Sequence, residues 1–135
     1  MRSGGREPCD DLGWPCFEGP NRTPQYRSHA FCRSYYEREE ARTPWVAIRR
    51  AKVVSITGGV PLTAAEGWPA EYANSYVFGD WLTSELYTVP LSERSPTPLR
   101  FAGHAAGPVA FALGPDGSLY YLAINVGELR RITPG

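Results

Sequence analysis

The chain has 135 residues, of which 42% are hydrophobic and 13% aromatic, and its formal net charge is zero. This length supports one modest core and is too short for two independent domains of ordinary size. Residues 1–52 hold ten Lys and Arg against seven Asp and Glu, and residues 53–135 hold four against seven. Such a small asymmetry argues against a nucleic-acid partner. No stretch reaches the roughly 18 consecutive apolar residues of a membrane span, and residues 1–20 contain no apolar core of a signal peptide.

Residues 1–52 are predicted to form a loop-rich segment with three cysteines, Cys9, Cys16 and Cys32. An odd count leaves at least one of them unpaired within the chain. A disulfide between Cys16 and Cys32 would close a loop of about 17 residues, stabilise the fold by roughly 3 kcal/mol and indicate an oxidising compartment. Free thiols remain an alternative. Metal ligation is disfavoured because His29 is the only nearby histidine and no Cys-x-x-Cys spacing occurs.

The only helix-friendly composition lies at residues 34–42, where weak apolar periodicity predicts at most a short surface helix. From residue 53 onward the chain has the pattern of short strands separated by Gly and Pro, which predicts an all-β fold. A β-branched run at 53–60 ends at the paired glycines Gly58 and Gly59, where the backbone can bend sharply or approach another segment closely. Further strands are expected at residues 76–81, 85–89 and 99–102, with a crossover at 103–107.

The last three predicted strands form an antiparallel meander at residues 109–113, 118–124 and 128–132. Turns at residues 115–117 and 125–127 separate them, and each turn ends on a glycine that accepts positive φ. The middle strand carries apolar residues on both faces, so both faces need to be covered. Sliding the chain by 43 residues places the hairpin at 76–89 on this meander. A repeat of about 40–50 residues built of short strands is typical of β-propeller blades.

Four motifs in order resemble the glucose/sorbosone dehydrogenase family: LGWPCFEG at 12–19, SITGG at 55–59, WPAEY at 68–72 leading into YVFGD at 76–80, and GPDGSLY at 114–120. The resemblance covers about residues 10–133. It implies a partial six-bladed β-propeller, namely its last two blades at residues 53–103 and 107–135, preceded by the loop-rich segment 1–52. It also implies an extracellular or periplasmic location and, from some extracellular members, a Cys16–Cys32 pair.

The resemblance further implies sugar oxidation with pyrroloquinoline quinone (PQQ) and calcium as cofactors. Ser55 matches the position at which quinone-binding members place a hydroxyl against the cofactor. The cationic residues that those members use are not matched, because Gly107, Val109 and Leu82 stand near their positions. The resemblance assigns the histidine base and the calcium-binding loop to earlier blades, which have no counterpart here, and neither His29 nor His104 falls in a matching motif. Buried carboxylates are costly unless paired, so quinone binding by this chain is disfavoured.

Other candidate residues have structural explanations. Asp116 is expected to specify a turn, and Asp80, at the end of a strand, is expected to cap backbone amides rather than to catalyse. Trp14, Trp68 and Trp81 are expected to seal blade edges rather than to stack on a sugar. No set of residues predicts a metal site. We therefore carry two functional hypotheses: part of a PQQ-dependent sugar oxidoreductase, or a non-catalytic propeller module that binds a carbohydrate or a protein. Either hypothesis requires further blades or self-association to cover the open faces.

Overall fold

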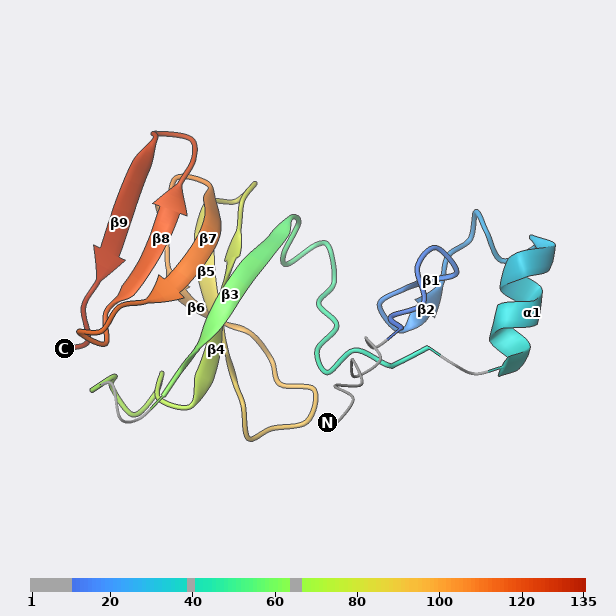
Figure 1. Cartoon of the computed structure of the whole chain (residues 1–135), viewed down its shortest axis with the longest axis horizontal. Helices are drawn as coiled ribbons and strands as arrows, with labels where there is room; N and C mark the ends of the chain where they lie inside the picture. The colour runs from blue at the N-terminus through green and yellow to red at the C-terminus, as the bar shows by residue number, and fades with distance from the viewer. Residues whose placement is uncertain (1–10, 39–40, 64–66) are drawn as a thin grey trace, which may run out of the picture. The chain divides into compact units, whose positions relative to one another are not determined.

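The computed structural model describes residues 11–38, 41–63 and 67–135, and the chain divides into two compact units after Ala47 (Figure 1). The described residues form three antiparallel sheets and one short helix, which confirms the predicted all-β class. Cys9 lies outside the described residues. No helix in the described ranges is long and apolar enough to cross a membrane.

The first unit consists of a small hairpin joined to a helix by a disulfide. Strands β1 (Phe17–Glu18) and β2 (Asn21–Arg22) form the hairpin, and α1 spans Ala30–Arg38. Cys16 is bonded to Cys32, which confirms the disulfide among the alternatives that the sequence left open. The helix begins earlier than the predicted residue 34. The helix extends to these earlier residues because Cys32 and Tyr35, three residues apart, lie on one helix face and are both buried against the hairpin.

The second unit contains a four-stranded sheet in the order β3 (Ile56–Leu62), β4 (Ser75–Asp80), β5 (Glu85–Pro90) and β6 (Leu99–Ala102). Strand β3 begins later than predicted because the Val54 and Ser55 amides donate to the Asp80 carboxylate instead of joining a strand ladder. The expected irregularity at the paired glycines is present as a register shift between Thr57 and Gly59. A Cβ at Gly59 would lie 1.9 Å from the Val77 carbonyl oxygen, so this position requires glycine.

A three-stranded sheet follows, built from β7 (Pro108–Leu113), β8 (Leu119–Ala123) and β9 (Glu128–Ile132). Both predicted turns are confirmed, with Gly117 at φ 74° and Gly127 at φ 67°. Asp116 has the expected structural role, because its carboxylate accepts hydrogen bonds from the Ser118 amide at 3.1 Å and the Ser118 hydroxyl at 2.9 Å. These bonds hold the turn between β7 and β8.

The two sheets of the second unit pack on each other through apolar side chains. One cluster contains Leu62, Val77 and Leu119, and a second contains Leu86, Tyr121 and Ala123. The opposite face of the four-stranded sheet is covered by the chain itself, where Val53 packs on Phe78, Tyr87 and Val89. The four-stranded sheet is therefore covered on both faces.

Sequential antiparallel order places every second connection at the same end of each sheet, and the hydrogen bond from Thr57 to Pro108 puts these two ends side by side. β3, β5, β7 and β9 begin at this end, and the segments before β3 and β7 and the turns after β4 and β8 all lie there. We call it the shared end. Trp68 lies elsewhere, buried against Leu62 and Val77, which matches its expected sealing role.

The outer face of the three-stranded sheet carries exposed apolar residues. Leu122 and Leu129 face each other across β8 and β9, and they are 46% and 67% exposed. Alternation along the strands places Tyr120 on the same face, opposite Ala112 of β7. The sequence predicted that both faces of this meander need a partner, and this face is the one left open.

We therefore expect the chain to self-associate through this outer face, because exposed contiguous apolar surface favours association. Sedimentation velocity over a concentration series should show oligomers for the natural chain. Leu129→Lys should shift them toward monomer, whereas Leu91→Lys, at a similarly exposed leucine outside this sheet, should not. A natural chain that stays monomeric throughout the series would contradict the expectation.

Candidate functional site

The shared end contains a hollow of about 530 Å³ that both sheets line. Its walls come from four segments that are distant in sequence: the approach to β3, the turn after β4, the start of β7 and the turn after β8. The described residues that line it are Ser55, Thr57, Trp81, Val109, Ile124 and Asn125. The hollow is open on one side, so a bound molecule would stay in contact with solvent.

A buried carboxylate fixes the first wall of the hollow. Asp80 is fully buried and accepts hydrogen bonds from four backbone amides, those of Val54, Ser55, Leu82 and Thr83, at 2.7 to 3.3 Å. Burial raises the pKa of Asp80, but these amide hydrogen bonds outweigh burial and lower its pKa below the ordinary value. The predicted structural role of Asp80 is confirmed, since all four donors belong to the backbone that positions Ser55 and the turn containing Trp81.

The loop at residues 103–107 forms backbone hydrogen bonds to both the turn after β4 and the turn after β8. The Ala105 amide donates to the Ser84 carbonyl at 2.8 Å, and the Asn125 amide donates to the Ala106 carbonyl at 3.1 Å. Gly107 has φ 71°, and a Cβ there would lie 2.7 Å from the Asn125 side chain. A larger residue at this position would displace Asn125 from the hollow.

The two sheets meet directly beside the hollow. The Thr57 hydroxyl of β3 donates to the Pro108 carbonyl of β7 at 2.8 Å. This hydrogen bond holds Thr57 and the adjacent Val109 at the floor where the two sheets join. The hollow is thus a product of sheet packing as well as of loop conformation.

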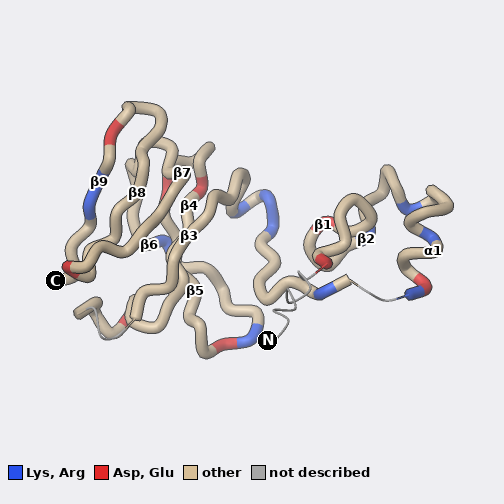
Figure 2. The backbone as a smooth tube through the Cα atoms, in the orientation of Figure 1, with Lys and Arg blue, Asp and Glu red and all other residues tan. Residues whose placement is uncertain are grey.

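The lining of the hollow is uncharged and amphipathic. It offers the hydroxyls of Ser55 and Thr57, the side-chain amide of Asn125 and the indole of Trp81, which is 43% exposed. Among the described lining residues there is no Lys or Arg. No Asp, Glu, Lys or Arg stands at residues 101–115, and the tube of β7 is accordingly tan in Figure 2.

The structure brings together some of the residues that the sequence singled out. Ser55 and Val109 line the same hollow. Gly107 does not line it but lies against the side chain of Asn125, which does. Leu82 is 61% exposed and is not among the described lining residues. His104 is not among the described lining residues either. Its backbone carbonyl oxygen accepts a hydrogen bond from the Arg130 guanidinium.

Three lining residues were not predicted as site residues. Trp81 was expected to seal a blade edge rather than to stack on a sugar, and in the structure it is 43% exposed and lines the hollow. Thr57 and Asn125 carried no signal as site residues, because their role depends on contacts between different sheets and loops. In the described ranges, no group of three or more His, Cys, Asp or Glu side chains is arranged to hold a metal ion.

Comparisons of the chain with models of protein families, with curated proteins and with solved structures gave no match. The resemblance to the glucose/sorbosone dehydrogenase family therefore stays a prediction.

Asp80→Asn should destabilise the second unit by about 1–3 kcal/mol, because an amide group would face backbone donors that need an acceptor. Since the pKa of Asp80 is lowered on folding, its ionised form contributes stability above the unfolded pKa of about 3.9, and this contribution is lost as the pH falls through the folded value.

Urea unfolding of the natural chain and the Asp80→Asn variant across the acidic range measures this contribution. The difference in unfolding free energy should be constant near neutral pH and shrink below about pH 4. Asp116→Asn, at an exposed turn carboxylate, is the matched control and should cost less. Equal stability of the natural chain and Asp80→Asn at neutral pH would contradict the role assigned to Asp80.

Proposed function

We propose that the two sheets of the second unit are neighbouring blades of a β-propeller of the glucose/sorbosone dehydrogenase type, and that the hollow at the shared end binds a neutral carbohydrate without oxidising it. Consecutive antiparallel strand order in both sheets supports the blade assignment, as does the direct contact between their first strands through Thr57 and Pro108. In this proposal the open outer face is covered by further blades or by a second copy of the chain.

The observation that carries the carbohydrate proposal is the composition of the hollow. Sugars present hydroxyl groups together with apolar C–H faces. An indole face packs on such C–H surface, and the Ser55 hydroxyl and the Asn125 amide supply both donors and acceptors. The Thr57 hydroxyl, which donates to the Pro108 carbonyl, adds an acceptor. Because none of the described lining side chains is charged, a neutral ligand needs no compensating charge. The open geometry predicts weak binding.

Quinone-dependent sugar oxidation is the second candidate, and the location of Ser55 favours it. Ser55 lines the hollow, and the family resemblance assigns this position to a cofactor-binding hydroxyl. PQQ carries three carboxylates, however, and the described lining offers no cation to pair with them. A basic side chain at Gly107 would also displace Asn125, because a Cβ there would lie 2.7 Å from the Asn125 side chain.

The disulfide supports an extracellular or periplasmic location for either candidate. Cys16 and Cys32 are bonded and buried, and such bonds persist in oxidising compartments. The location itself remains part of the proposal, as does the participation of a sugar.

Trp81→Ala tests the carbohydrate proposal. Isothermal titration of the natural chain with glucose and with maltose should give saturable, weak binding, and the variant should bind about tenfold more weakly because it lacks the stacking surface. Trp14→Ala, which removes an exposed tryptophan of the first unit, should bind like the natural chain. Equal sugar affinity for Trp81→Ala and the natural chain would rule out this hollow as the binding site.

The quinone candidate is tested by titrating the chain with PQQ in the presence of calcium and following the quinone absorbance. We expect no saturable binding, because the cofactor carboxylates would stay unpaired. Ser55→Ala is the informative variant. Saturable binding of PQQ that Ser55→Ala weakens would overturn the preference for a non-catalytic site and favour the oxidoreductase.

A further inference from the structure

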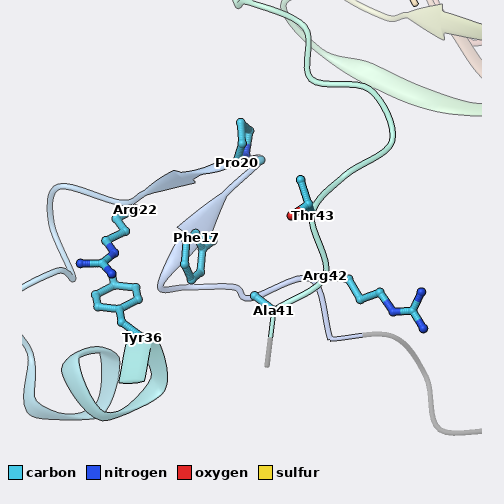
Figure 3. A pocket seen from close by; sticks show the side chains of 8 residues that line it. Phe17, Pro20, Arg22, Tyr36, Ala41, Arg42 and Thr43 are labelled. Atoms are coloured by element: carbon cyan, nitrogen blue, oxygen red, sulfur yellow. The ribbon is translucent and has the colours of Figure 1, made fainter. Parts of the chain in front are cut away.

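A second hollow lies in the first unit, apart from the two sheets and independent of the function proposed for them. It has a volume of about 230 Å³ and is formed by the β1–β2 hairpin, α1 and the segment at residues 41–43 (Figure 3). The described residues that line it are Phe17, Gly19, Pro20, Arg22, Tyr36, Ala41, Arg42 and Thr43. In Figure 3, Arg22 and Tyr36 lie on one side of Phe17, and Ala41 and Thr43 lie on the other.

The walls of this hollow are held in place by covalent and polar contacts. The Cys16–Cys32 disulfide joins the start of the hairpin to α1. The Tyr36 hydroxyl donates to the Cys16 carbonyl at 2.9 Å, and the Tyr36 ring packs edge-on against Phe17 with centroids 5.2 Å apart. Tyr36 is therefore fixed from two directions, and a preformed wall lowers the ordering cost of binding.

The Arg22 side chain is held in place by an aromatic ring and forms none of the ion pairs found among the described residues. Its guanidinium carbon lies 4.2 Å from the centroid of the Tyr36 ring, a cation–π contact. Stacking occupies a flat face of the guanidinium, and its N–H edges remain able to donate two parallel hydrogen bonds to a carboxylate.

The other side chains of the hollow determine what else the ligand carries. Phe17, Pro20 and Ala41 provide apolar surface, and Thr43 adds a hydroxyl. Arg22 and Arg42 both line the hollow, and Arg22, which is held against the Tyr36 ring, is the cation on which we base the site. Cationic side chains beside apolar walls suit an organic anion that carries an apolar body.

We propose that this hollow binds a small organic acid through its carboxylate, with Arg22 forming a bidentate pair and Phe17 packing on the apolar body of the acid. A volume of about 230 Å³ accommodates a single ring with one carboxylate. Because Tyr36 depends on the Cys16 carbonyl, the disulfide positions Arg22 indirectly.

Benzoate is the probe, and benzyl alcohol is its neutral control. In ¹H–¹⁵N NMR titrations of the full oxidised chain, benzoate should give saturable shifts at Phe17, Arg22 and Tyr36, whereas benzyl alcohol should give much smaller ones. Arg22→Gln should weaken benzoate binding at least tenfold. Arg22→Lys should weaken it less, because it retains the charge and loses the bidentate geometry. Arg27→Gln, at an exposed arginine outside the hollow, should match the natural chain.

The backbone spectrum of each variant shows whether the first unit is still folded. If Arg22→Gln is unfolded, the comparison of Arg22→Lys with Arg27→Gln decides the matter. Absence of saturation with benzoate would overturn the proposal. Equal shifts with benzyl alcohol, or equal loss of affinity in Arg27→Gln, would also overturn it, because the contact would then be non-specific.

Discussion

The close approach of β7 to β4 is the constraint on which the second unit depends. A Cβ at Gly79 would lie 2.7 Å from the Thr57 hydroxyl, 2.8 Å from Pro108 and 2.9 Å from Phe111. Only glycine lets the two sheets meet at this distance, and the hydrogen bond from Thr57 to the Pro108 carbonyl then forms across the junction. Without this approach the hollow at the shared end would lose its floor.

The same packing explains why the hollow is neutral. Asp80 directly precedes Trp81 of the lining, but its buried carboxylate accepts hydrogen bonds from four backbone amides instead of facing the hollow. A side chain at Gly107 would have to adopt positive φ and would displace the Asn125 side chain, so a cation there would change the lining of the hollow. A polar but uncharged lining is therefore a consequence of how the sheets are joined, and it directs the proposal toward a neutral sugar.

Much of the fold could be predicted from local patterns, whereas the hollow could not. Alternation and glycine-ended turns located the last three strands, because those signals lie within a few residues of each other. The start of β3 was misplaced because Asp80, which binds the amides of Val54 and Ser55, lies far along the chain. The crossover before β7 was predicted at residues 103–107, but its conformation was not, since His104 and Ala106 take positive φ without being glycine. Asn125 lines the hollow only because that loop holds it.

The most direct test of the account is an NMR titration of the chain with glucose that follows the Trp81 indole and the Asn125 side-chain amide. These two groups come from different sheets and meet only if the shared end forms the hollow described. Both signals should shift along the same saturation curve, with one dissociation constant. Shifts confined to one of them, or to residues away from the shared end, would contradict it.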